Sequence, residues 1–173
     1  FIDFTTSLDK SRVELKQLNY KKKLTQKASV NFKSNLVLRK YYLINSLLFI
    51  EGKSEIVLDN IKLNKKYQIT DLKNLKVKTY INNVKNNDFS VEKTKNISIS
   101  GEVFDAQPLL KSLFENNDKQ TFSNKFNSEI KINFKKVIAG EDDNVSDLGV
   151  IANINSGSYN KLSLKGHFSD NEI

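Results

Sequence analysis

The residues that could do chemistry in this chain are few, and only one group of them is clustered. Four carboxylates, Glu141, Asp142, Asp143 and Asp147, lie close together near the C-terminal end. Carboxylate oxygens are the ligands that Ca²⁺ prefers, but the spacing lacks the central Gly and the closing Glu of an EF-hand loop. We therefore interpret this segment as a solvated acidic loop rather than a metal site.

The chain has few residues that could support nucleophilic or acid–base catalysis. The chain has 173 residues, no Cys and one His, His167. The lack of Cys excludes disulfides, Cys-ligated zinc and thiol nucleophiles, and one His disfavours a His-based triad or a multi-His metal site. Serines such as Ser98 and Ser163 have no elbow motif and no neighbouring base. The sequence also has no glycine-rich phosphate loop, so we expect no enzyme activity, no cofactor and no metal.

The charge balance raises the question of an anionic partner. Lys and Arg number 28 against 20 Asp and Glu, which gives +8 at pH 7. Such a balance suits nucleic acid or an anionic membrane surface. The lysines, however, are spread along the chain, with one run at 21–23, and Arg12 and Arg39 are the only arginines. Nucleic-acid readers favour Arg for bidentate contacts. We interpret the lysines as the solvated face of a sheet and expect no nucleic-acid partner.

The strands that carry these residues are predicted by a two-residue period of apolar and polar side chains. Apolar residues alternate with Lys, Ser, Asn and Glu, which is typical of strands with one apolar and one wet face. The clearest segments are 13–15, 28–32, 56–58, 61–63, 75–77, 89–91, 97–99, 130–134 and 162–164. The polar connections at 51–54, 59–60, 86–88 and 155–158 are typical of hairpin turns or bulges. We predict a mostly β protein, a long antiparallel meander of on the order of ten to thirteen strands.

One segment departs from this period. Within residues 105–115, apolar residues recur at helical spacing: Leu109, Leu110, Leu113 and Phe114. Asp105 suits an N-cap, and Pro108 suits a first turn, where no intrahelical N–H is lost. The pattern predicts one short amphipathic helix.

The apolar face of the sheet must be buried, either in a closed sandwich or barrel or in a curved sheet whose face lines an open groove for acyl chains. Periodicity alone favours the closed core.

The segment 97–110, ISISGEVFDAQPLL, favours the open groove over the closed core. It resembles the AsmA-like superfamily of bacterial envelope proteins, the YhdP/TamB-type bridge-like proteins, and most closely the YhdP-type branch. In that group a strand ending in Ser-Gly leads to Phe-Asp and then Pro-Leu-Leu at the start of a short helix. The motif residues here are Gly101, Phe104, Asp105 and Pro108.

The resemblance implies a fold and a function. Such proteins are anchored in the inner membrane of Gram-negative bacteria and extend a taco-shaped β-groove across the periplasm, along which phospholipids move to the outer membrane. We therefore expect residues 1–173 to be a single fragment of a longer repetitive protein, periplasmic, with acyl chains as its partner. The expected groove residues are Ile97, Ile99, Ile130, Ile132, Phe134, Leu162 and Leu164. The helix residues Leu109, Leu110, Leu113 and Phe114 would pack on a rim or plug one end.

Two other functions remain open at this point. The first is a structural or adhesive β protein of a surface or the periplasm, in which the apolar phase is a closed core. The second is a nucleic-acid or anionic-surface binder driven by the +8 charge, for which steeply salt-dependent binding would be the sign.

Overall fold

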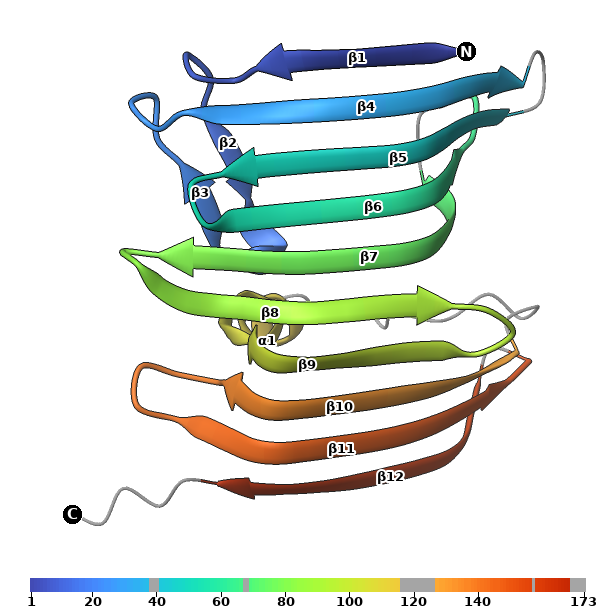
Figure 1. Cartoon of the computed structure of the whole chain (residues 1–173). Coiled ribbons are helices and arrows are strands. Elements are labelled where there is room, and N and C mark those ends of the chain that lie inside the picture. Colours follow the sequence, from blue (N-terminus) through green and yellow to red (C-terminus); the bar gives the residue numbers. More distant parts are fainter. Residues whose placement is uncertain (38–40, 67–68, 116–126, 157, 169–173) are drawn as a thin grey trace.

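The computed structural model describes residues 1–37, 41–66, 69–115, 127–156 and 158–168 (Figure 1). In this part of the chain there are twelve strands, one α-helix and one 3₁₀ turn. The strands are β1 (Ile2–Ser7), β2 (Val13–Leu15), β3 (Tyr20–Lys22), β4 (Ala28–Val37), β5 (Tyr41–Glu51), β6 (Ser54–Leu63), β7 (Ile69–Ile81), β8 (Val84–Lys93), β9 (Ile97–Asp105), β10 (Ser128–Ile138), β11 (Asn144–Asn155) and β12 (Ser158–Phe168). The helix is α1 (Gln107–Glu115), and the 3₁₀ turn is η1 (Lys16–Leu18).

Ten of these strands form one sheet in the order β1-β4-β5-β6-β7-β8-β9-β10-β11-β12, and β2 and β3 pair separately. The predicted mostly β fold, with one short helix and a long meander, is confirmed. Neighbouring strands in the sheet are antiparallel except β9 and β10, which are parallel. The exception arises because α1 lies between them in the sequence and the chain returns to the starting side before β10 begins. In the described residues β1 and β12 are the two ends of the order, so the sheet is not closed.

A small second layer covers part of one face of the sheet. The β2–β3 hairpin and α1 lie behind the sheet in Figure 1, at the end of the strands where β5, β7 and β9 terminate. We call the face that they contact the inner face and the opposite one the outer face. Two buried clusters join this layer to the sheet, one around Tyr20, Phe49 and Val77 and the other around Ala106 and Phe134.

Asparagine supplies several of the turns and irregularities. Gly52 has φ 53° between β5 and β6, as the polar connection at 51–54 predicts. The turn between β7 and β8 is formed by Asn82 and Asn83, with φ of 49° and 66°. Two residues with positive φ match the right-handed twist of a hairpin. Asn60, with φ 54°, lies inside β6.

The segment 86–88, predicted to be a hairpin turn or a bulge, forms an irregularity inside β8 rather than a turn: Asn87 pairs with Thr79 and Lys85 with Tyr80, so Asn86 is the extra residue between them. Asn86 and Asn87 lie inside β8 and are 5% and 0% exposed. A run of Asn indicates a turn when its side chains bond to the local backbone. Here these side chains bond to residues of other elements instead. Of the predicted connection at 155–158, Asn155, Ser156 and Ser158 are described, and Gly157 is outside the described residues.

Candidate functional site: the apolar inner face of the sheet

One apolar residue from each of the ten strands lies in direct register across the inner face. We call this set the apolar row. Its members, in sheet order, are Phe4, Phe32, Leu47, Leu58, Leu75, Val91, Ile99, Ile132, Val150 and Leu164. With about 4.8 Å between neighbouring strands, nine intervals give an apolar strip roughly 43 Å long, perpendicular to the strands.

The apolar row is only partly covered. Its eight inner members are half-buried, while Phe4 and Leu164 at the two sheet edges are 46% and 69% exposed. The row therefore presents a continuous apolar surface that is accessible along its length. Apolar area that stays accessible to water is the physical requirement for binding an apolar ligand.

On one side of the apolar row the inner face is sealed by the second layer. Phe49, Ile56 and Val77 lie in register there and are 2–5% exposed, packed beneath Tyr20 of β3. The predicted groove residue Phe134 belongs to this sealed side, because it is 5% exposed and lies in the cluster with Ala106 at the base of α1. It is a core residue rather than part of the accessible surface.

On the other side of the apolar row a second apolar set crosses the last four strands. It consists of Ile97, Ile130, Ala152 and Leu162, each paired with the next. Ile97 and Ile130 are half-buried, Ala152 is buried, and Leu162 on the edge strand is 63% exposed. The structure thus brings six of the seven predicted groove residues together on one accessible face: Ile97, Ile99, Ile130, Ile132, Leu162 and Leu164.

The helix α1 meets the sheet mainly through its first turns. It is seen nearly along its axis behind β8 and β9 in Figure 1, so it projects away from the inner face. Of the four apolar residues predicted to pack, Leu110 contacts the cluster around Phe134. Leu109, Leu113 and Phe114 are 48%, 53% and 84% exposed. The packing prediction is wrong for these three side chains, because a nine-residue helix that projects from the sheet presents little of its surface to it.

The motif Gly101, Phe104, Asp105 and Pro108 lies at the base of this helix and has structural roles. A Cβ at Gly101 would lie 2.2 Å from the main-chain oxygen of Asp88, so only glycine fits beside β8 at this point. Phe104 stacks on Phe134 with ring centroids 5.3 Å apart, and Phe89 meets both rings edge-on. Such aromatic contacts stabilise beyond the area that they bury.

Asp105 is the centre of a buried polar network that fixes the second layer to the sheet. Its Oδ1 accepts a hydrogen bond from the main-chain N–H of Gln107, at the start of α1, over 3.2 Å. Its Oδ2 accepts from Asn19 Nδ2 at 2.9 Å and from Asn86 Nδ2 at 3.5 Å. The main-chain N–H of Asp105 donates to Asn87 Oδ1 at 3.0 Å. Burying a carboxylate costs little stability when it accepts several hydrogen bonds, and it is costly when it accepts none.

The same network reaches the loop between β2 and β3. Asn87 Nδ2 donates to the main-chain oxygen of Leu18 at 2.8 Å and to Thr79 Oγ1 at 3.0 Å. Thr79 Oγ1 in turn donates to Asn86 Oδ1 at 2.8 Å. Thr79 and Asn87 are fully buried. Sequence reasoning missed these residues, because a buried Asn pair in a strand carries the same local signal as a turn.

Two further polar groups belong to this sealed end. Lys22 is fully buried and its Nζ donates to the main-chain oxygens of Ser11 and Lys23 at 2.9 and 3.0 Å. Tyr20 donates its hydroxyl to Glu51 Oε2 at 3.1 Å, and burial, together with the Glu51 charge, raises the pKa of the Tyr20 phenol. Both side chains hold the hairpin against the sheet rather than facing an open site.

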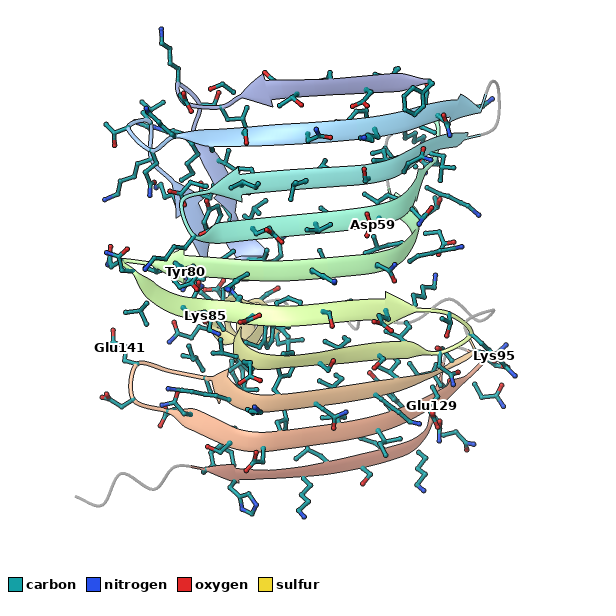
Figure 2. All side chains as sticks on the ribbon, viewed as in Figure 1. Asp59, Tyr80, Lys85, Lys95, Glu129 and Glu141 are labelled. Atoms are coloured by element: carbon teal, nitrogen blue, oxygen red, sulfur yellow. The ribbon has the colours of Figure 1, made fainter. Side chains whose placement is uncertain are left out.

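The outer face is polar and carries ion pairs. Lys135 Nζ lies 2.9 Å from Glu102 Oε1. A further ion pair lies at the end of the inner face: Lys93, in register with Ile97, donates to Asp71 at 2.7 Å, which lowers the pKa of Asp71. A hollow of about 700 Å³ lies on the outer face over β6 to β11, between lysines and carboxylates. Figure 2 shows Tyr80 and Lys85 at the end of the strands where α1 lies, and Lys95 and Glu129 at the opposite end. These charges keep the outer face in water.

The other residues singled out by type are solvent-facing. Glu141, Asp142, Asp143 and Asp147 are exposed around the turn between β10 and β11. His167 is exposed on β12, opposite Ser146. In the described ranges no group of three or more His, Asp or Glu side chains is placed to hold a metal ion. None of the helices described here is long and apolar enough to span a membrane.

Comparisons with known proteins give one partial similarity. The chain is 31% identical over 113 residues to a protein of Dictyostelium discoideum described as "Adenylate cyclase, germination specific". The similar segment is 65% of this chain and 13% of that protein, so the chain spans a small part of this relative. No family model matches the chain, and no solved structure matches it. The apolar inner face, defined by its geometry, is accordingly the candidate functional site.

Proposed function

We propose that this chain is a periplasmic segment of a membrane-anchored, bridge-like envelope protein of the AsmA-like type. Its inner face binds the acyl chains of phospholipids and carries them between the inner and outer membranes. The observation that carries this proposal is the apolar row, one accessible apolar residue from each of ten strands in unbroken register.

The chemistry of the row suits an acyl chain. Every member is an aliphatic or aromatic side chain, so the row offers no hydrogen bond and no charge to a ligand. Each CH₂ group removed from water contributes about 0.8 kcal/mol, without a requirement for orientation. A surface of this kind holds a long hydrocarbon chain while allowing it to move along the row, which is what transport needs.

The open sheet supports the same function. A barrel or a sandwich would fill the space over the apolar row with its own side chains. Here the described sheet ends at β1 and β12 without closing, and the second layer seals only one side of the inner face. The edge members of the row are also accessible, so a ligand can pass from one edge of the sheet to the other.

Site-specific photo-crosslinking tests the proposal directly. The photo-reactive residue p-benzoylphenylalanine replaces Ile99 or Ile132 in the row, and the chain is incubated with vesicles of phosphatidylethanolamine and phosphatidylglycerol before irradiation. We expect phospholipid adducts at both positions, detected as a mass increase of the intact protein. Ser98 and Lys131 are the matched controls, because each is the preceding residue on the same strand and is exposed on the outer face.

The outcome separates the lipid groove from a closed structural module. Adducts at Ile99 and Ile132 with none at Ser98 and Lys131 support the groove. Equal labelling of both faces, or lipid-free protein at all four positions, contradicts it. An Ile132→Asp substitution should also reduce labelling at Ile99, its register partner, because a carboxylate in the row makes the surface unfavourable for hydrocarbon.

A further inference from the structure

The run of lysines at 21–23 does not lie on the large sheet. It begins in β3 of the small hairpin, where Lys22 is fully buried and its two neighbours, Lys21 and Lys23, are exposed. Because Lys22 holds the hairpin in place, the charges of Lys21 and Lys23 are presented to solvent beside the ends of the sheet strands. The lipid proposal gives these two lysines no role.

A polar hollow of about 740 Å³ lies between this hairpin and two turns of the sheet. The hairpin side contributes Lys21 and Lys23, and the β5–β6 turn contributes Lys53. The β7–β8 turn contributes the amide side chains of Asn82 and Asn83. Among the described residues that line the hollow, none belongs to the apolar row. It is therefore a site separate from the lipid-facing surface.

The charges around the hollow are unbalanced. Lys21, Lys23 and Lys53 carry three positive charges, and Glu51 is the one carboxylate among the described residues of the lining, which leaves an excess of two positive charges. Within the described ranges, none of these three lysines forms an ion pair. This holds also for Lys21 and its register partner Glu14. The excess charge is therefore available to a ligand.

The backbone that carries the three lysines is fixed by buried contacts. The Tyr20 hydroxyl donates to Glu51 Oε2 over 3.1 Å, which joins the hairpin to β5. The main-chain N–H of Tyr80, labelled in Figure 2, donates to Ser54 Oγ over 3.2 Å, which joins β7 to the start of β6. Tyr20 and Ser54 are 2% and 1% exposed. A ligand in the hollow would therefore cost little in backbone ordering.

A phosphate monoester fits this charge and polarity. It carries about −1.5 to −2 charges at pH 7 and three acceptor oxygens, whereas a phosphodiester carries a single charge. Lysine ammonium groups are common ligands of phosphate. The amides of Asn82 and Asn83 can bond to hydroxyl groups of whatever carries the phosphate. We propose that this hollow binds a phosphate monoester, with Lys21, Lys23 and Lys53 as the groups that neutralise it.

A phosphate monoester occurs on small soluble molecules and on one phospholipid headgroup, that of phosphatidic acid. Glycerol 3-phosphate represents the soluble source, and its binding is measured by titration calorimetry. The triple variant Lys21→Gln, Lys23→Gln and Lys53→Gln should weaken this binding at least about 10-fold. All three side chains are exposed, so an unchanged thermal unfolding midpoint shows that the fold is kept.

A control variant removes the same charge elsewhere. It combines three exposed lysines of β10 and β12 that do not line the hollow: Lys136→Gln, Lys161→Gln and Lys165→Gln. It should leave the affinity for glycerol 3-phosphate within about 2-fold, since exposed charges at a distance are screened by salt. Glu51→Gln should instead tighten the binding, because it removes the negative charge and keeps an oxygen that can accept from Tyr20.

Vesicle co-sedimentation tests the lipid source. Phosphatidylcholine vesicles contain either phosphatidic acid, a monoester, or the same amount of phosphatidylglycerol, a diester. The apolar row meets acyl chains in both, so stronger binding to phosphatidic acid that the hollow triple variant abolishes reports the hollow alone. Photo-crosslinking at Ile99 and Ile132 should be unaffected by the three lysine substitutions, which keeps this proposal separable from that of the lipid groove.

The combined results decide the source and the site. Binding of glycerol 3-phosphate that depends on the three lysines indicates a soluble ligand. A lysine-dependent preference for phosphatidic acid without glycerol 3-phosphate binding indicates the lipid headgroup. The proposal is overturned if neither form binds, if both triple variants weaken binding equally, or if the hollow triple variant keeps the affinity of the unmodified chain.

Discussion

Asn19 Nδ2 donates a hydrogen bond to Asp105 Oδ2 over 2.9 Å, which joins residues that are 86 positions apart in the sequence. Asn19, with φ 48°, follows η1 in the small layer, and Asp105 is the last residue of β9. The bond therefore connects the β2–β3 hairpin, the sheet and the start of α1 at one point. The sealed side of the inner face depends on this junction.

Removing the carboxylate of Asp105 should destabilise the protein strongly. Asp105→Ala leaves the N–H groups of Gln107, Asn19 and Asn86 without their acceptor. Unpaired buried donors are costly, so we expect the free energy of unfolding to fall by about 2–4 kcal/mol. Urea denaturation followed by circular dichroism measures this. Glu141→Ala, in an exposed loop, is the control and should change stability by less than about 0.5 kcal/mol.

Two glycines of the sheet should respond differently to alanine. A Cβ at Gly101 would meet Asp88 O at 2.2 Å and Phe89 Cβ at 2.5 Å. The nearest atom to a Cβ at Gly149 is Asn133 Oδ1, at 3.7 Å. We expect Gly101→Ala to cost about 1–3 kcal/mol through overpacking, and Gly149→Ala to be neutral or slightly stabilising. Equal unfolding midpoints for the two variants would contradict the close contact of β8 and β9.

The aromatic cluster at the base of α1 should matter far more than the aromatic residue near the end of that helix. Phe134→Ala removes a side chain that is 5% exposed and touches Phe89 and Phe104. We expect a loss of about 3–5 kcal/mol in the free energy of unfolding. Phe114→Ala, at a position 84% exposed, should change it by less than about 0.5 kcal/mol. Thermal and urea denaturation of both variants provide the comparison.

Tyr20 should cause a loss of stability at alkaline pH. Its phenol pKa is raised above the ordinary 10.0, first by burial and then by the Glu51 charge. Above pH 10 the unfolded chain loses this proton while the folded chain keeps it, so the free energy of unfolding falls as pH rises. Tyr20→Phe removes this decrease. It should cost about 1 kcal/mol at pH 7, where the hydrogen bond to Glu51 is lost.

Urea denaturation at a series of pH values between neutrality and pH 11 measures the effect. The informative quantity is the difference between Tyr20→Phe and the unmodified chain, because the many lysines titrate in both. Tyr159→Phe, exposed on β12, keeps Tyr20 and should follow the unmodified curve. A constant difference across the whole range would mean that Tyr20 does not contribute to the alkaline loss.

The strands and their faces could be predicted from the sequence because each follows from a local pattern. Alternation over residues such as 97–99 and 130–134 places apolar side chains on one face wherever a strand forms. The helix at 105–115 is equally local, since it depends on Asp105, Pro108 and apolar spacing. The sheet class, the helix and the shared face of Ile97, Ile99, Ile130, Ile132, Leu162 and Leu164 could therefore be predicted from local patterns.

What pattern reasoning could not provide depends on contacts between distant residues. Phe134 has the same alternating environment as Ile132, and only the position of α1 makes it core. Asn86 and Asn87 look like a turn because their partners, Leu18 and Asp105, are far away in the sequence. The apolar row likewise requires the register of nine strand pairs, which no single segment specifies.

The asparagines at positive φ bear on which substitutions the turns of this protein tolerate. Asn19, Asn60, Asn82 and Asn83 adopt left-handed backbone conformations, while the whole chain has only six glycines. Asn tolerates this conformation better than other residues with a side chain. A genome whose base composition favours Asn codons can therefore replace turn glycines without changing the direction of the chain. The sheet can therefore keep its geometry while the residues at its turns change.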